Sequence, residues 1–198
     1  ALAARGAEII DADAIGRELQ QPGQPLLQKL SDRFGAQIIT ADGALDRPAL
    51  AAIAFTDADA LKDLNAIVHP AIGGEVLRRI EAASHTERVV VMDIPLLTEN
   101  PREGLQGIVV VDVPVETQVE RLVRFRGFTE DDARARIAQQ ATREARLATA
   151  TFVIDNSGDL SALEPQVEAL WQWLSALPQL PPGATGARAD EVDGSAEA

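Results

Sequence analysis

The chain has 198 residues, of which 46% are hydrophobic, enough for one ordinary domain with small insertions and a core of its own. Its formal net charge of −13 argues against non-specific nucleic-acid binding, which needs a basic surface. No apolar run approaches a membrane span, the N-terminal residues lack the pattern of a signal sequence, and there is no Cys. Composition therefore predicts a cytoplasmic protein with no nucleic-acid or membrane partner.

Four short runs of β-branched residues predict strands. After a helical tail closed by Gly6, the first run covers residues 7–10, and the others cover 89–94, 107–113 and, more weakly, 152–154. The runs do not alternate between apolar and polar residues, which is typical of strands covered on both faces. We therefore expect an α/β protein with a parallel central sheet.

The residues between the first two strands, 20–83, read as helix after helix. One helix ends at Gly35, a second is capped by Asp46, a third covers 57–68 and a fourth begins at Pro70. Such a crossover is much longer than a connection between parallel strands needs. It predicts a helical insertion on the C-terminal side of the sheet, where ligands of open parallel sheets bind.

Beyond the third strand, a helix is expected to run to Arg126 and stop at Gly127. Thr129 begins another helix, with Asp132 in the place of a capping-box acid, and its narrow apolar stripe suggests a mobile lid. A closing helix over 160–177 has core-packing periodicity, which favours a structural role for Trp171. Residues 178–198 are predicted to be a disordered acidic tail.

Carboxylates follow two of the predicted strands. Asp11 and Asp13 lie on the same side of an extended chain, directly before a helix. Only one of the two aspartates is needed as the helix cap. For the other, a functional role and a structural role are equally favoured. Asp93 ends the second strand, where an acid can organise Mg²⁺ through water or simply form the turn before Pro95.

Other polar residues have two readings as well. His69 stands at the expected junction of two helices, where capping or packing is the commoner role and catalysis the rarer one. Arg136, Arg143 and Arg146 fall towards one side of a continuing helix, an arrangement suited to a triphosphate. The alternative is that these arginines pair with acidic neighbours, namely Glu130, Asp131, Asp132 and Glu144.

Taken together, these patterns resemble the dephospho-CoA kinase family. The similarity extends from Ala1 to about Leu177, and its blocks occur in the family's order. The most specific block is Gln140-Ala141-Thr142-Arg143-Glu144-Ala145-Arg146-Leu147. The others are Ile10-Asp11-Ala12-Asp13 with Arg17-Glu18-Leu19, residues 40–47, His69-Pro70-Ala71-Ile72, residues 93–100, residues 111–113 with 116–118, and Asp155-Asn156-Ser157-Gly158.

The resemblance implies a P-loop kinase-like, three-layer α/β fold. Residues 1–19 and 84–177 would form the nucleotide-binding core with a lid at about 127–147, and residues 20–83 the helical domain for CoA. Magnesium-ATP would give its γ-phosphoryl group to the ribose 3′-hydroxyl of dephospho-CoA. Because such a transfer needs little covalent chemistry from the protein, positioning and charge neutralisation would do most of the catalysis.

The same resemblance implies roles for individual residues. Asp13 would take the proton from the 3′-hydroxyl, and Arg146 would meet the ATP phosphates. The remaining candidates are Arg143, Arg121 and Asn156 for ATP, Asp11, His69, Pro70, Leu96 and Glu99 for the substrate, and Asp93 for indirect contact with Mg²⁺.

One feature of the family is missing. The sequence contains no Gly-x-x-x-x-Gly-Lys-Ser/Thr motif, which would be expected before the helical tail at Gly6. We therefore expect the first strand and the P-loop to be absent from this chain, and the chain by itself to have negligible activity. Two other readings are another small-molecule P-loop kinase and a non-catalytic module that binds a CoA-like ligand.

Overall fold

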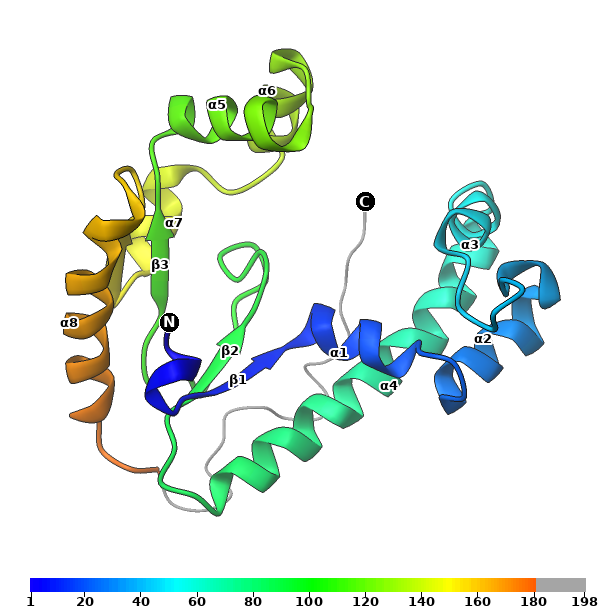
Figure 1. Cartoon of the computed structure of the whole chain (residues 1–198), viewed down its shortest axis with the longest axis horizontal. Coiled ribbons are helices and arrows are strands. Elements are labelled where there is room, and N and C mark those ends of the chain that lie inside the picture. The colour runs from blue at the N-terminus through cyan, green and yellow to red at the C-terminus, as the bar shows by residue number, and fades with distance from the viewer. Residues whose placement is uncertain (181–198) are drawn as a thin grey trace. The chain divides into compact units, whose positions relative to one another are not determined.

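The computed structural model describes residues 1–180, and the chain divides into two compact units. The α4 unit comprises residues 9–86 and 90–93. The β3–β4 unit comprises residues 1–8, 87–89 and, of the described residues, 94–180. Figure 1 labels the helices and strands of both units. The acidic tail predicted for 178–198 lies, from residue 181, outside the described residues.

The α4 unit is mainly helical. Aspartates cap three of its helices, and for Asp46 this confirms the prediction. The Asp11 and Asp46 side chains accept hydrogen bonds from backbone N–H groups at 2.9 and 3.0 Å, respectively. Asp57 caps its helix in the same way. Its helices are α1 (Ala12–Leu19), α2 (Pro25–Phe34), the short 3₁₀ helix η2 (Ala36–Ile38), α3 (Arg47–Ala54) and α4 (Ala58–Ser84).

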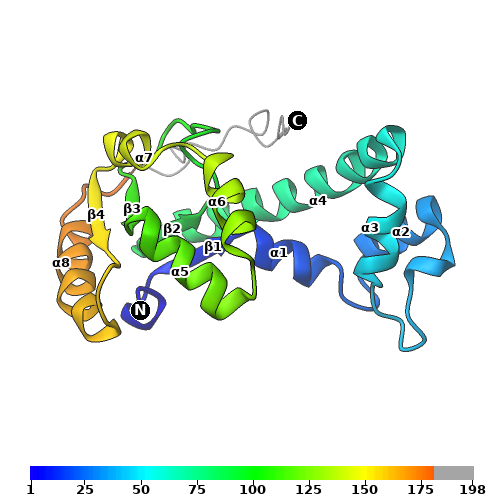
Figure 2. The ribbon, with the colours of Figure 1, turned by 90° about the horizontal axis from the view of Figure 1, so that it is seen from above.

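The longest helix corrects the prediction of a break at His69-Pro70. Helix α4 is continuous over 27 residues and contains Pro70 in its interior. Proline has no N–H group to bond the preceding turn, and this normally ends or kinks a helix. Here α4 packs against α1, α2 and α3, so tertiary packing outweighs the local cost (Figure 2).

Two groups of buried apolar side chains stabilise the α4 unit. The larger joins α2, η2, α3 and α4 through Leu26, Leu30, Phe34, Ile38, Leu50 and Ala60. The smaller joins the first strand, α1 and α4 through Ile10, Ile15, Val76 and Ile80. Leu19, the last residue of α1, packs against both groups. The orientation of α1 is therefore fixed by side chains from several elements.

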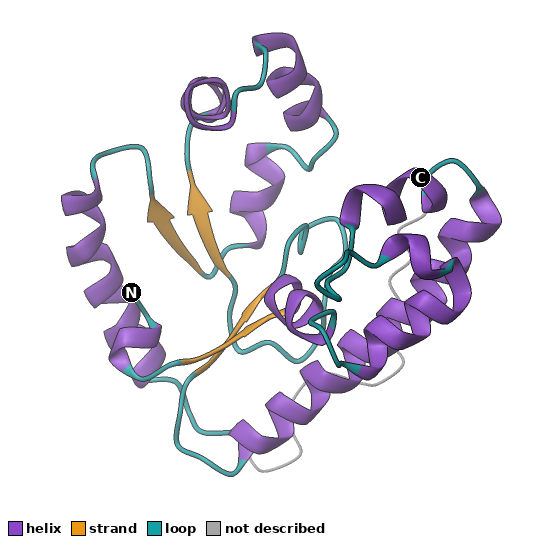
Figure 3. Cartoon of the chain, turned by 45° about the vertical axis from the view of Figure 1, so that its right-hand side comes forward, coloured by secondary structure: helices purple, strands orange, loops and turns teal. Residues whose placement is uncertain are grey.

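Strands occur where the sequence predicts them. β1 (Glu8–Asp11) and β2 (Val90–Asp93) form a two-stranded sheet (Figure 3). In the β3–β4 unit, β3 (Val109–Asp112) and β4 (Phe152–Asp155) pair in parallel, with Val109 opposite Phe152 and Asp112 opposite Asp155. The predicted parallel pairing is thus confirmed for this second sheet.

Helices of the β3–β4 unit follow the predicted starts and stops. Gly127 ends α5 with a φ of 71°, and the Thr129 hydroxyl accepts a hydrogen bond from the Asp132 N–H at 3.1 Å, as a capping box requires. The helical elements are η1 (Ala3–Arg5), α5 (Val115–Arg126), α6 (Glu130–Ala138), α7 (Arg143–Thr149), η3 (Leu160–Ala162) and α8 (Leu163–Ser175).

The expectation of one continuing helix under the arginines is wrong. α6 ends at Ala138, and the Thr142 side chain starts α7 by accepting a hydrogen bond from the Ala145 N–H at 3.1 Å. Arg136 is thereby separated from Arg143 and Arg146, and its guanidinium lies 4.6 Å from the centre of the Phe128 ring.

Strand coverage in the β3–β4 unit also differs from the prediction. α7 packs against β3 and α8 against β4, yet Val111 is 61% exposed and Val153 is 42% exposed. The Phe152 and Trp173 rings are 5.7 Å apart, and both tryptophans of the chain lie on α8. Burial on both faces is therefore not reached within the described residues.

No helix in residues 1–180 is long and apolar enough to cross a membrane.

Candidate functional site

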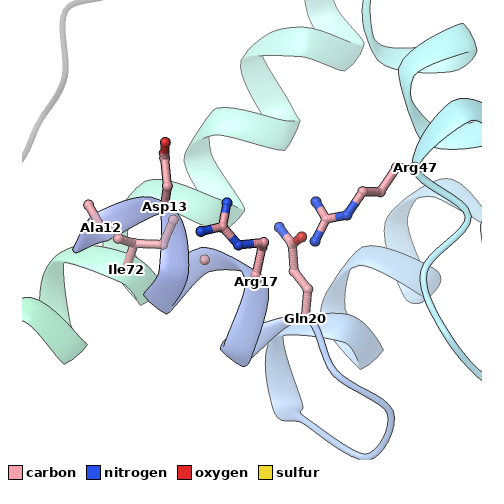
Figure 4. A pocket seen from close by; sticks show the side chains of 7 residues that line it. Ala12, Asp13, Arg17, Gln20, Arg47 and Ile72 are labelled. Atoms are coloured by element: carbon pink, nitrogen blue, oxygen red, sulfur yellow. The ribbon is translucent and has the colours of Figure 1, made fainter. Parts of the chain in front are cut away.

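An open hollow of about 220 Å³ lies in the α4 unit, along one side of α1 (Figure 4). Three helices supply its lining: α1 with its C-cap residue, the first residue of α3, and the middle of α4. The lining residues are Ala12, Asp13, Gly16, Arg17, Gln20, Arg47 and Ile72. Polar and charged side chains thus surround a small apolar floor.

The spacing of residues along α1 explains how this lining forms. Asp13, Gly16, Arg17 and Gln20 follow at intervals of three, one and three, which places them on one side of a helix. Gly16 is buried against α4, where a β-carbon would approach the Ile72 side chain to 3.0 Å. The absence of a side chain at Gly16 therefore allows close packing at the floor.

Asp11 and Asp13 have different surroundings. One Asp11 oxygen accepts the hydrogen bond from the Ala14 N–H that caps α1, and the other lies 3.9 Å from the Arg17 guanidinium. Asp13 is exposed in the first turn of α1, and its carboxylate has no hydrogen bond or ion pair with any described residue. Asp11 is thus the helix cap, while the Asp13 carboxylate is free to meet a ligand.

Three further polar groups at the hollow lack a full set of ion-pair or hydrogen-bond partners among the described residues. Arg47 has no ion pair with any residue between 1 and 180, and the contact of Arg17 with Asp11 is long and largely exposed. The Gln20 side-chain oxygen is buried and accepts no hydrogen bond within the described chain. A buried acceptor without a hydrogen bond costs about 1–3 kcal/mol. The Gln20 side of the hollow therefore contains an unsatisfied polar atom.

His69 and Pro70 lie on α4 close to the hollow in sequence. His69 is half-buried and precedes the lining residue Ile72 by three positions, nearly one turn. Its ring makes no hydrogen bond with the described residues. Pro70 is exposed on the next position around the helix.

A charged network occupies the ends of β3 and β4 in the other unit. The Arg143 guanidinium donates from Nε and Nη2 to both oxygens of Asp112, at 2.6 to 3.1 Å. Asp112 is 8% exposed, and its hydrogen bonds with Arg143 lower the pKa of the carboxyl group and raise the pKa of the guanidinium. The Asp112 carbonyl also accepts a hydrogen bond from the Asn156 N–H at 2.8 Å.

Two other predicted arginines differ in their contacts. Arg146 donates to the Ala141 carbonyl at 2.6 Å, and its charge contributes to the lowered pKa of Asp112. Arg146 therefore lies near the Asp112–Arg143 pair. Arg121 is half-buried on α5 and has no ion pair with the described residues.

The loop after β2 contains Leu96 and Glu99. Leu96 is 47% exposed and has a φ of 57°, a left-handed conformation uncommon for a non-glycine residue and often found at functional sites. A Glu99 oxygen accepts a hydrogen bond from the Ala141 N–H at 2.7 Å, which joins this loop to the turn before α7. Both residues belong to the β3–β4 unit.

Asp93 ends β2 in the α4 unit and is exposed. Among residues 1–180 no three His, Cys, Asp or Glu side chains gather as a metal site would require. Asp93 therefore offers a single carboxylate.

The acidic partners expected for the arginine set are wrong within the described residues, because none of the three arginines forms an ion pair with the four acids named for them. Glu130 instead pairs with Arg134 at 2.8 Å, and Arg134 also bridges to Glu116. The contact with Glu116 joins α6 to α5, whereas the pair with Glu130 lies within α6.

Sequence reasoning missed four residues of these sites: Arg17, Gln20 and Arg47 in the hollow, and Asp112 in the network. The helical intervals from Asp13 contained a signal for Arg17 and Gln20. Arg47 comes from a different helix, and the partner of Asp112 is 31 residues away in the chain, so no local pattern marked them.

A sequence model of dephospho-CoA kinase matches residues 1–162. The chain belongs to the dephospho-CoA kinase family. The resemblance found in the sequence is thereby confirmed. A dephospho-CoA kinase of Streptomyces avermitilis is 50% identical over 171 residues, which cover 86% of this chain and 83% of that protein. The dephospho-CoA kinase of Thermobifida fusca is 47% identical, with coverage of 87% and 86%.

Solved structures have the same α/β fold. A crystal structure of a Thermus thermophilus protein superposes with a TM-score of 0.64 at 30% identity, covering 87% of both chains. The dephospho-CoA kinase from Campylobacter jejuni gives a TM-score of 0.65 at 23% identity, again over 87% of both chains. The second similarity is one of fold alone.

Proposed function

We propose that the function of this protein is the reaction of its family, the ATP-dependent phosphorylation of the ribose 3′-hydroxyl of dephospho-CoA to give coenzyme A. The negligible activity expected of the 198-residue chain by itself stays a prediction. The observation that carries the proposal is Asp13, a carboxylate without a partner among the described residues, which lines an open hollow in a member of the dephospho-CoA kinase family. The chain also matches its curated relatives over most of their length.

Asp13 is the general base in this proposal. A carboxylate oxygen of Asp13 accepts the proton of the 3′-hydroxyl as that oxygen attacks the γ-phosphorus of ATP. Since Asp11 is engaged as the cap of α1, it positions the helix rather than taking the proton. Its second oxygen still faces Arg17, so Asp11 contributes to the substrate side through that residue.

On the nucleotide side, the arginines neutralise phosphate charge. Asp112 holds Arg143 through Nε and Nη2, which leaves Nη1 available for an anionic ligand. Arg146 and Arg121 supply further guanidinium groups, and Asn156 contacts the adenine. We assign helices α6 and α7 to the lid, because α7 carries Arg143 and Arg146.

Mg²⁺ in nucleotide sites is typically held by one or two carboxylates together with phosphate oxygens. Asp93 fits the role of that single carboxylate, acting through water. When bound, the ion would neutralise the phosphates. We assign the remaining substrate contacts to His69 and Pro70 on α4 and to Leu96 and Glu99 in the loop after β2.

A binding experiment tests Asp13 without requiring turnover, which suits a chain that has no Gly-x-x-x-x-Gly-Lys-Ser/Thr motif. Coenzyme A differs from dephospho-CoA only by its 3′-phosphate, so the Asp13 carboxylate should repel the product. Asp13→Asn should tighten binding of coenzyme A about fivefold to tenfold, and leave binding of dephospho-CoA within about twofold. Isothermal titration calorimetry measures both affinities.

Asp32→Asn is the matched control, since it removes one exposed carboxylate from α2 in the same unit. It should change neither affinity. The assignment of Asp13 is wrong if Asp13→Asn leaves the ratio of the two affinities unchanged. The proposed function itself fails if the folded wild-type chain does not bind dephospho-CoA.

A further inference from the structure

The two arginines of the hollow have positive charges that the described residues leave largely uncompensated. Arg33, Arg78 and Arg79 of the α4 unit each have a carboxylate within 2.8 Å. Arg17 has only the 3.9 Å contact with Asp11, and Arg47 has no ion pair in residues 1–180. The chain as a whole has a net charge of −13, whereas the lining of this hollow, with two arginines and one aspartate, has a positive balance of charge.

Figure 4 shows how these side chains lie. Asp13, Arg17, Gln20 and Arg47 follow one another across the view, and the Gln20 amide lies between the two guanidinium groups. Arg47 comes from the first residue of α3, whose start is fixed by the Asp46 cap. The two arginines therefore come from different helices and point into the same hollow.

Phosphate groups suit this arrangement. A guanidinium group donates from a planar fork that matches two phosphate oxygens, and two such groups can share the oxygens of a diphosphate. A single carboxylate ligand would leave one of the arginines without a partner. The charge of the lining thus favours an anion with several oxygens.

Dephospho-CoA carries such a group on the same ribose as the hydroxyl that is phosphorylated. Its 5′-diphosphate is separated from the 3′-oxygen by C3′, C4′, C5′ and one oxygen. Asp13 and Arg17 are four residues apart on α1, or about 6 Å along the helix axis, a comparable span. One ribose can therefore present its 3′-hydroxyl to Asp13 and its diphosphate to the arginines.

We propose that Arg17 and Arg47 bind the 5′-diphosphate of dephospho-CoA and thereby align its 3′-hydroxyl with Asp13. This inference rests on the proposed function and assigns a part of the substrate to the hollow.

Calorimetry with dephospho-CoA on the full 198-residue chain tests the arginines. Arg17→Gln and Arg47→Gln should each weaken binding about 10- to 100-fold, the effect expected for a lost charge-assisted hydrogen-bond pair. Arg47→Lys should bind with intermediate affinity, because lysine keeps the charge but not the fork. The salt dependence of the affinity should also become shallower in both glutamine variants.

Arg78→Gln is the matched control. It removes one positive charge from the same unit, at an exposed position on α4 where the arginine is paired with Glu75. It should bind dephospho-CoA like the wild type, and circular dichroism should show that every variant is folded.

The inference is overturned if both glutamine variants bind dephospho-CoA within twofold of the wild type, or if Arg78→Gln weakens binding as much as they do. Either result would leave the proposed function standing, because the wild type still binds. Loss of binding in the folded wild type would refute the proposed function as well.

Discussion

The α4 unit and the β3–β4 unit bury their side chains differently. The largest fully buried side chains, Ile10, Ile15, Leu30 and Ile38, all belong to the α4 unit. In the β3–β4 unit, Val111 and Phe125 are 61% and 67% exposed, whereas the carboxylate of Asp112 is buried against Arg143. The residues of the hollow thus stand on apolar cores, and the residues around Asp112 on a charged network.

This difference indicates what holds each set of residues in place. Apolar packing fixes α1, and with it Asp13, while the Asp13 carboxylate has no partner among residues 1–180. In the other unit the polar groups position one another, since Asp112 contacts both Arg143 and Asn156. Substitutions should therefore affect the two units through different forces.

The largest effect should come from the core of the α4 unit. Leu30 is fully buried, so Leu30→Ala should lower the free energy of unfolding of that unit by about 2–5 kcal/mol. Urea denaturation followed by far-UV circular dichroism reports on the helices of both units, of which the α4 unit has the larger share. Fluorescence reports on the β3–β4 unit alone, because Trp171 and Trp173 both lie on α8.

Leu30→Met is the control for this core, since it conserves volume and should cost less than about 1.5 kcal/mol. Equal shifts of the fluorescence and circular dichroism transitions in Leu30→Ala would show that the contrast between the units does not extend to their stability.

An intermediate effect should depend on pH in the β3–β4 unit. Because Arg143 lowers the pKa of Asp112, the pair stabilises the folded state above the unfolded pKa, near 4, and loses this contribution as pH falls through the folded pKa. Asp112→Asn should therefore flatten the acid side of the stability profile measured by tryptophan fluorescence. The expected change is about 1 kcal/mol between neutral and low pH.

Glu75→Gln provides the matching measurement in the α4 unit. Hydrogen bonds from Arg78 and Arg79 lower the pKa of Glu75 to about 2, so its contribution has the same sign and disappears as pH falls from about 4 towards 2. Its substitution should affect the circular dichroism transition. If each variant instead flattened the profile of the other unit, the charges would not act where the structure places them.

The smallest effect should be at the exposed strand positions. Val111→Thr should change stability by no more than about 0.5 kcal/mol, because the side chain is 61% exposed. Ile154, its register partner on β4, is 5% exposed, and Ile154→Thr should cost about 1–3 kcal/mol. Chemical denaturation followed by fluorescence compares the two. A cost at Val111 as large as at Ile154 would mean that Val111 is covered in solution.

Local signals predicted much of the fold. Asp46, Gly127 and the Thr129–Asp132 pair act through neighbouring backbone groups, so their patterns located helix ends correctly. Pro70 misled because its effect depends on what α4 packs against, which involves distant residues. The break at Thr142 could have been read from its capping pattern, but the periodicity of the arginines concealed it.

The candidate sites likewise combine residues that a local sequence pattern marks with residues that the fold brings together from distant parts of the chain. Asp13 was predictable because a strand end and a helix start are adjacent in sequence, and only the assignment of the cap to Asp11 required the structure. Arg47 joins the hollow from another helix, and Arg143 meets Asp112 across 31 positions. Neither contact has a local signature, so sequence reasoning alone could not find it.

Through Leu19, the geometry of the hollow depends on side chains that do not line it. This side chain ends the helix that carries Asp13 and Arg17, and it packs into both apolar groups of the α4 unit. A change of shape in either group can therefore rotate or shift α1, and a displacement of about 1 Å can cost an enzyme about 100-fold in rate. Slow turnover in a variant of the distant core would thus report a displacement of Asp13, the proposed base, without any lost contact to the substrate.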